Sequence, residues 1–182
     1  MTRGHQERLA PMVRDLMAAS GTRFQALDRI AVTVGPGSFT GLRVGLAFGK
    51  GLALALGRSC VGVGTLEALA ASLAPAGWRA AIIDAGRGRA YLQVFEAAQP
   101  VTAPDIIAVE TVAARLLEVC GAAAITLVGP GVGALAGLLP RCDAVEMTAP
   151  SPLAVAALGA RASLVPPRPL YMRAPDARPK TA

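Results

Sequence analysis

Aromatic side chains are scarce in this chain, at 4% of 182 residues, although 53% of the residues are hydrophobic. Ala, Val and Leu must therefore fill the core. The scarcity also argues against the aromatic stacking platforms that bind single-stranded RNA. Lysine is rare as well, since Lys50 and Lys180 are the only two, so arginine supplies nearly all of the formal charge of +6. A nucleic-acid surface and a coding bias toward arginine both explain this charge.

Histidine and cysteine are almost absent, which limits metal and redox chemistry. His5 is the only histidine, so the chain cannot build an HExxH zinc site or another site that needs two histidines. Cys60, Cys120 and Cys142 are odd in number and form no CxxC pair, which favours a reducing cytosol over a disulfide framework. The sequence predicts no metal site and no catalytic triad.

Long apolar segments typical of targeting signals or membrane spans are also missing. The N-terminus lacks the apolar region of a signal peptide. The uncharged stretch from Val119 to Pro140 is long enough to cross a bilayer. Its centre, however, reads Gly129-Pro130-Gly131-Val132-Gly133, which favours a strand, a glycine turn and a short helix. The sequence therefore predicts no contact with a membrane.

Hydrophobic periodicity predicts helices and strands in alternation, the pattern of an α/β protein. Pro75-Ala76-Gly77 divides the chain into a first lobe, 1–74, and a second lobe, 75–182. The first lobe is expected to contain helices at 5–20, 42–56 and 66–73 and strands at 30–34 and 60–63. The second is expected to contain strands at 80–84, 90–96, 125–128 and 144–147, helices at 109–119, 132–139 and 153–164, and an extended tail.

The first lobe is predicted to be short of strands. About three strands or more, with one face covered, are needed for a sheet that is stable by itself. The pattern predicts two, so we expect the sequence to start after the first strands of this lobe. The alternative is a non-functional fragment, which would aggregate through its open, apolar sheet edge.

One segment is more informative than the others: a strand, a glycine loop and a glycine-studded helix. The loop reads Gly35-Pro36-Gly37-Ser38-Phe39-Thr40-Gly41. A unit of this kind directs backbone N–H groups at a ligand over the helix N-terminus. It matches neither the Walker A motif, which needs Gly-Lys-Ser/Thr, nor the dinucleotide motif, which has two spacers before its last glycine. Phosphate binding and a tight turn with close helix packing both explain it. The candidate phosphate-binding residues are Gly35, Gly37, Ser38, Thr40 and Gly41.

The block Gly35–Gly45 resembles the signature of the TsaB family, also called YeaZ, of bacterial tRNA threonylcarbamoyladenosine modification. Other matches extend along the whole chain. They are Arg3-Gly4-His5 with Leu9 and Pro11-Met12, the stretch Gly62–Leu69, the hairpin Asp84–Tyr91, and Pro169–Arg173 with Asp176-Ala177. The resemblance implies an actin/Hsp70-like fold of two lobes, each with an RNase H-like sheet, and a first lobe incomplete at its N-terminus.

The same resemblance implies a non-catalytic scaffold. Members of the family bind TsaD, a threonylcarbamoyltransferase, work with the ATPase TsaE, form homodimers when alone, and meet tRNA only indirectly. No cofactor is expected, with any ATP held by the partner subunits. The first helix and the glycine helix would dock against the partner. The expected interface residues are Leu9, Met12, Val13, Leu16, Gly41, Arg43, Val44, Gly45, Phe48, Gly49 and Leu52.

An enzyme of the same fold is the alternative hypothesis. An ATPase or phosphotransferase would use Gly35–Gly41 as its phosphate loop. Asp84, or an aspartate upstream, would hold a metal ion. Asp84 also fits a purely structural role, because an aspartate in a turn accepts hydrogen bonds from nearby backbone groups.

Overall fold

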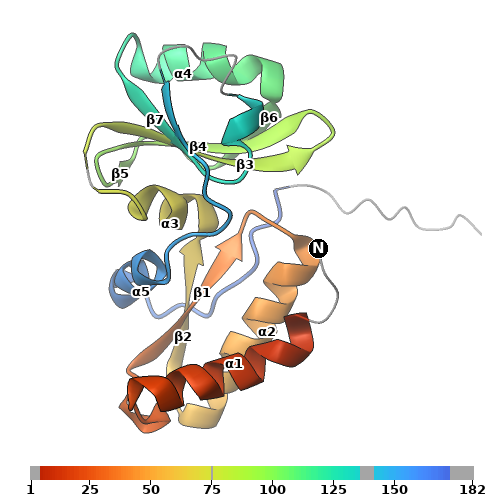
Figure 1. Ribbon diagram of the computed structural model, residues 1–182, viewed down its shortest axis with the longest axis vertical. Coiled ribbons are helices and arrows are strands. Elements are labelled where there is room, and N and C mark those ends of the chain that lie inside the picture. Colours follow the sequence, from red (N-terminus) through yellow and green to blue (C-terminus); the bar gives the residue numbers. More distant parts are fainter. Residues whose placement is uncertain (1–4, 75, 136–141, 173–182) are drawn as a thin grey trace, which may run out of the picture.

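The computed structural model describes residues 5–74, 76–135 and 142–172, which form two lobes joined near the middle of the molecule (Figure 1). In the first lobe, strand β1 (Arg29–Gly35) pairs in parallel with β2 (Ser59–Gly64), and helix α2 (Phe39–Leu56) connects them. Helix α1 (His5–Ser20) and the short η1 (Phe24–Ala26) precede β1. Among the described residues this sheet has two strands, the number predicted from the sequence.

Helix α2 forms one layer of the first lobe because its apolar residues repeat at helical spacing. Leu42, Leu46, Gly49 and Ala53 are buried at intervals of three and four residues. A Cβ atom at Gly49 would meet Val32, so the helix lies close to β1. By length and composition α2 could also cross a membrane. In this structure its apolar face packs on the sheet.

Helix α5 (Pro152–Arg161) returns from the end of the chain to cover the opposite face of the same sheet. Gly159 faces Ala31 and Val61, whereas α2 faces Ile30, Val32 and Cys60. Successive residues of a strand point to opposite faces, so the two helices enclose the sheet between them. The returning helix therefore packs against the first lobe.

In its described residues the second lobe has a six-stranded mixed sheet with the order β5-β4-β3-β7-β8, and β6 pairs with β4. Its strands are β3 (Trp78–Gly86), β4 (Arg89–Glu96), β5 (Gln99–Pro100), β6 (Asp105–Ala108), β7 (Ile125–Val128) and β8 (Cys142–Val145). The pairs β3–β4, β4–β5 and β4–β6 are antiparallel, and β3–β7 and β7–β8 are parallel.

Helices cover both faces of this sheet and form two core clusters. On one face α4 (Val112–Cys120), preceded by η2 (Val109–Thr111), packs Val112 and Leu116 against Leu127. On the other face α3 (Thr65–Ala71) packs Leu66 and Leu69 against Phe95. The core is mainly aliphatic, as the composition predicted.

Most predicted elements are present, with three differences. Strands β5 and β6 were not predicted. The last strand of the sheet is Cys142–Val145, two residues earlier than expected. The short helix expected at 132–139 is a 3₁₀ turn, η3 (Val132–Ala134), and the rest of that range from 136 onward lies outside the described residues.

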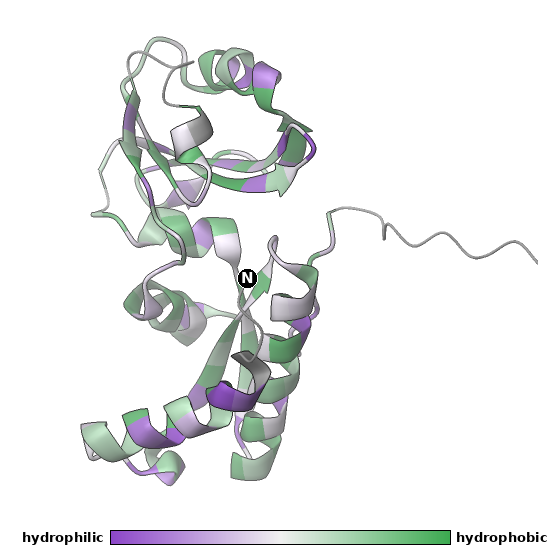
Figure 2. Ribbon diagram, turned by 45° about the vertical axis from the view of Figure 1, so that its right-hand side comes forward, coloured by the Kyte–Doolittle hydropathy of each residue, from purple (hydrophilic) through white to green (hydrophobic). Residues whose placement is uncertain are grey.

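Polarity along the helices separates α1 from α2. Figure 2 shows α2 hydrophobic along most of its length, whereas α1 alternates hydrophilic and hydrophobic residues. No residue from 7 to 20 of α1 is buried, although Leu9, Val13 and Met17 are half-buried. Part of the apolar stripe of α1 is therefore left in contact with solvent.

Candidate functional site

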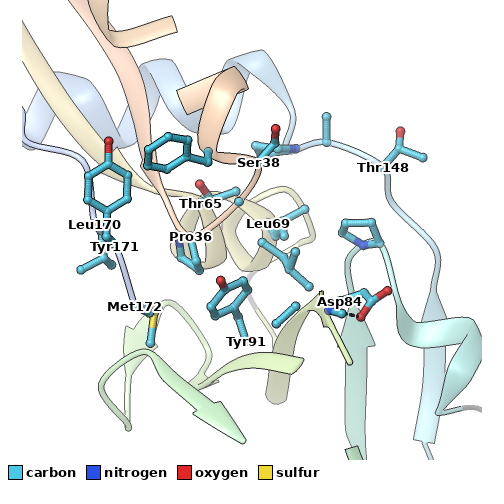
Figure 3. Close-up of a pocket in the computed structure, with 18 of the residues that line it drawn as sticks. Pro36, Ser38, Thr65, Leu69, Asp84, Tyr91, Thr148, Leu170, Tyr171 and Met172 are labelled. Atoms are coloured by element: carbon cyan, nitrogen blue, oxygen red, sulfur yellow. Dashed lines mark hydrogen bonds between the residues drawn. The ribbon is translucent and has the colours of Figure 1, made fainter. Parts of the chain in front are cut away.

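A cleft of about 1000 Å³ lies between the two lobes and is the candidate functional site (Figure 3). The first lobe contributes the glycine loop and the start of α2. The second contributes the end of β3 and the segment 148–150, and α3 lies between. The tail segment 170–172 forms one side. Most of the lining is apolar, with a few hydroxyl groups and the charged side chains of Asp84 and Arg43.

The tail crosses from one lobe to the other within three residues. The N–H of Leu170 donates to the carbonyl oxygen of Val34 in the first lobe at 2.7 Å. Met172 packs against the second-lobe cluster that contains Phe95. Tyr171 and Met172 leave the tail in opposite directions (Figure 3), as alternate residues of an extended segment do. The tail is thus a strap between the lobes.

The glycine loop is shaped by the strap and by the helix that follows it. Gly35 has φ +114, and a Cβ there would lie 2.9 Å from the carbonyl oxygen of Leu170, so only glycine fits. Ser38 is the N-cap of α2, because its hydroxyl oxygen accepts from the Gly41 N–H at 3.3 Å. These contacts support the tight-turn interpretation of the loop. Two other candidate phosphate-binding residues, Gly37 and Thr40, are exposed, and of these two Gly37 lines the cleft.

Asp84 lies near the end of β3 and lines the cleft. Its Oδ1 atom accepts from the Gly86 N–H at 2.7 Å. The strand pairing shifts register between these two residues, so Asp84 organises the turn into β4. Within the described residues, no three His, Cys, Asp or Glu side chains gather as a metal ion would require.

An exposed cluster at the rim of the cleft contains Phe39, Arg43 and Tyr171, and it was not predicted. The guanidinium carbon of Arg43 lies 3.8 Å from the centroid of the Phe39 ring and 5.9 Å from that of Tyr171. Its Nε donates to the Tyr171 hydroxyl oxygen at 3.0 Å. The two ring centroids are 5.2 Å apart. We call these three residues the rim cluster.

Thr65 is a second site residue that the sequence did not reveal. It begins α3 and lines the cleft beside Pro36 and Leu69 (Figure 3). Its hydroxyl oxygen is buried and has no hydrogen-bond partner in the part of the chain that the structure describes. A buried hydroxyl normally finds a partner, so this oxygen is an exception in the wall of the cleft.

The cysteines lie away from the cleft and are free and half-buried. Burial raises the pKa of the Cys60 thiol, and the nearby Lys50 acts in the opposite direction. Burial also raises the pKa of Cys120 and Cys142. A thiol with a raised pKa is a weak nucleophile at neutral pH, so these residues act as small apolar side chains.

The residues expected at a partner interface are divided between two sides of α2. Gly41, Val44, Gly45, Phe48 and Leu52 are exposed or half-buried, and nothing lies within 4 Å of a Cβ built on Gly45. On α1, Leu9 and Val13 are half-buried, whereas Met12 and Leu16 are 59% and 67% exposed. These residues are accessible to a partner.

Two of the expected interface residues make contacts within the chain itself. Gly49 is buried against Val32 of its own lobe, where its missing side chain permits close packing of α2 on β1. Arg43 belongs to the rim cluster. A helix turns about 100° per residue, so Arg43 and Gly45 point to nearly opposite sides.

Comparisons with known proteins identify relatives over most of the chain. Residues 1–134 match the family model "TsaD: tRNA N6-adenosine threonylcarbamoyltransferase". The chain is 37% identical over 101 residues to the tRNA threonylcarbamoyladenosine biosynthesis protein TsaB of Escherichia coli K12, covering 52% of this chain and 42% of that protein. It is 34% identical over 179 residues to an uncharacterized protein of Mycobacterium tuberculosis H37Rv, covering 97% and 79%.

A third relative, an uncharacterized protein of Mycobacterium leprae, is 33% identical over 181 residues, which is 99% of this chain and 47% of that protein. The chain thus spans less than half of the length of two of these curated relatives.

Among solved structures, YeaZ from Pseudomonas aeruginosa matches with a TM-score of 0.77 at 29% identity. A P. aeruginosa protein described as similar to peptidase YEAZ matches with a TM-score of 0.79 at 28% identity. Each covers 94% of this chain, which covers 85% of each. These matches confirm the expected actin-like, RNase H-like α/β fold.

Proposed function

This chain belongs to the TsaB (YeaZ) family, and on that premise we propose that it is a non-catalytic subunit in tRNA threonylcarbamoyladenosine biosynthesis. In this proposal it binds TsaD and activates it. TsaD then transfers the threonylcarbamoyl group to the adenosine beside the tRNA anticodon, and the ATPase TsaE assists the complex. The reacting groups belong to the partner, and this chain supplies the docking surface in the cytosol.

The observation that carries this proposal is the apolar surface of α1. Met12 and Leu16 lie one helical turn apart and are both more than half exposed. Apolar side chains that repeat on one helical face normally pack against another surface. Of this stripe, only Leu9, Val13 and Met17 are partly covered by the chain itself. A partner helix would cover the remainder.

Helix α2 extends this surface with small residues. Both views place α1 and α2 together at the same end of the first lobe (Figures 1 and 2). The space at Gly45 is open, and a helix backbone can approach a glycine more closely than any other residue. Gly41, Gly45, Phe48 and Leu52 then form a second row of contacts. With no TsaD present, the same face would pair two copies of this chain, since a two-fold dimer uses one patch on both subunits.

An ATP-binding enzyme of the same fold is the second candidate, favoured by the size of the cleft and by the unpartnered Thr65 hydroxyl. It would use Gly37, Thr40 and Asp84. Two contacts speak against this candidate: Ser38 caps α2, and Asp84 is engaged by its own turn.

Light scattering coupled to size-exclusion chromatography tests the docking proposal. We expect this chain and TsaD to form a one-to-one complex. Met12→Asp and Gly45→Leu should each weaken it at least about tenfold, the effect of losing about 1.4 kcal/mol at an interface. Leu54→Asp is the matched control, because Leu54 is 84% exposed on α2 but lies on the side away from Gly45.

None of the three variants should have a markedly lower thermal midpoint than the unchanged chain, because the substituted positions are not buried. Failure of the unchanged chain to bind TsaD would contradict the proposal, as would full tRNA modification by TsaD alone. Calorimetry with ATP and magnesium separates the second candidate, since saturable micromolar binding to this chain alone would favour the enzyme.

A further inference from the structure

The rim cluster exposes two aromatic side chains in a chain that has few of them. The sequence has four Phe, two Tyr and one Trp. Two of these seven aromatic side chains, Phe39 and Tyr171, lie side by side with 48% and 45% of their surface exposed. Aromatic side chains stabilise a fold mainly by being buried, and the core here is almost entirely aliphatic. The exposure of this pair at the mouth of a cleft therefore favours a role in ligand binding.

Arg43 adds a cationic group with a flat guanidinium to the cluster. Its guanidinium is stacked on the Phe39 ring at 3.8 Å and is also hydrogen-bonded to Tyr171. A guanidinium held in this way keeps its positive charge and presents a flat surface beside two rings. Flat aromatic faces next to an arginine plane are the surfaces on which unpaired RNA bases stack.

We propose that the rim cluster binds an unpaired base of an RNA strand by stacking, with the base entering the mouth of the cleft. The net charge of +6 favours RNA as the ligand, because a basic protein attracts a phosphate backbone. The inference deepens the proposed function, on which it rests for the identity of the RNA as the substrate tRNA. It differs from the expectation, implied by the family resemblance, that tRNA is met only indirectly.

The rim cluster and the proposed TsaD surface can be occupied together. Arg43 precedes Gly45 by two positions, which places it about 200° around the helix. Phe39 precedes Arg43 by one turn and lies on the same side as Arg43. An RNA strand at the rim therefore leaves Gly45 and the stripe of α1 free for the partner.

Fluorescence anisotropy with a labelled anticodon stem–loop RNA tests the proposal at one fixed salt concentration. The chain is measured alone and in its complex with TsaD, against a fully paired RNA of the same length. We expect Phe39→Ala and Tyr171→Ala to weaken binding of the stem–loop about tenfold each, as stacking contacts with single-stranded bases do. Leu54→Ala serves as the control and should leave the affinity unchanged, because Leu54 lies outside the cluster.

A conservative variant distinguishes stacking on the Tyr171 ring from the hydrogen bond that the Tyr171 hydroxyl accepts. Tyr171→Phe keeps the ring but removes the acceptor for the Arg43 Nε donor. We expect it to bind RNA within about twofold of the unchanged chain. If Tyr171→Phe loses as much affinity as Tyr171→Ala, the hydroxyl contact with Arg43 matters and the ring does not, and the inference is wrong.

Three other results would also overturn it. The unchanged chain could fail to bind RNA, or both alanine variants could bind RNA with unchanged affinity. The alanine variants could also lose TsaD binding while they keep RNA binding. The last would make the rim cluster a protein contact. Complex formation with TsaD, followed in parallel, distinguishes the two proposals. A chain that binds RNA through the rim cluster but never binds TsaD contradicts the proposed function alone.

Discussion

Alanine at position 129 is expected to lower the free energy of unfolding by at least about 3 kcal/mol. Gly129 directly follows β7 and has φ +130, a conformation that residues with a side chain rarely adopt. A Cβ atom there would also collide with the carbonyl oxygen of Ile82, on the adjacent strand β3. That oxygen belongs to the backbone of a central strand, so it cannot move without displacing the sheet.

Urea unfolding followed by circular dichroism measures this loss, and Gly57→Ala is the matched control. Gly57 ends α2 with φ +62, and nothing lies within 4 Å of a Cβ built on it. The control carries backbone strain without a collision, so it should lose only about 1–2 kcal/mol. Equal losses in the two variants would show that the contact with Ile82 contributes nothing.

The elements around the cleft could be predicted from the sequence because local patterns determine them. The apolar run of β1, the loop at Gly35–Gly41 and the spacing of Leu42 and Leu46 identified a strand, a turn and a helix. Strands β5 and β6 gave no such signal, because two residues that include Pro100 and a four-residue run after Pro104 are too short for a period to show. Their pairing with β4 is decided by tertiary contacts.

The rim cluster could be predicted from the sequence only in part. Phe39 and Arg43 are four residues apart on a helix, so their contact was open to prediction. Tyr171 is 128 residues from Arg43, and no local pattern predicts contacts at such a separation. Low aromatic content argued against a stacking platform. Composition counts residues, whereas the fold decides which of them meet, so the aromatic content alone could not predict this cluster.

The tail gives a similar lesson about long-range contacts. Pro166, Pro167 and Pro169 predicted an extended segment, since proline excludes helix and fixes the backbone. Its path could not be predicted, although Gly62 and Gly35 are the residues that accommodate it: Pro167 approaches the first and Leu170 the second. The glycines that permit the strap lie more than a hundred residues before it. These contacts between the tail and the two glycines can be recognised only in the folded structure.

The roles of the glycines of α2 also could not be predicted from their spacing alone. One substitution among them is expected to change the free energy of unfolding strongly. Gly41, Gly45 and Gly49 have equal spacing, so the sequence suggested one common role for them. In the structure Gly49 faces β1 and Gly45 faces open space. Gly49→Leu should therefore lower the free energy of unfolding by about 2–4 kcal/mol, because the added carbons must displace Val32 from the core of the first lobe.

Gly45→Ala in the same helix makes the comparison decisive. With no atom near its new Cβ, it should raise the free energy of unfolding by about 0.5–1 kcal/mol, the usual gain of alanine over glycine inside a helix. The two variants are thus expected to change stability in opposite directions, as measured by urea unfolding. If both stabilised the chain, α2 would not be packed on β1 as described. If both destabilised it, Gly45 would lie against another part of this chain, and the surface proposed for TsaD would already be occupied.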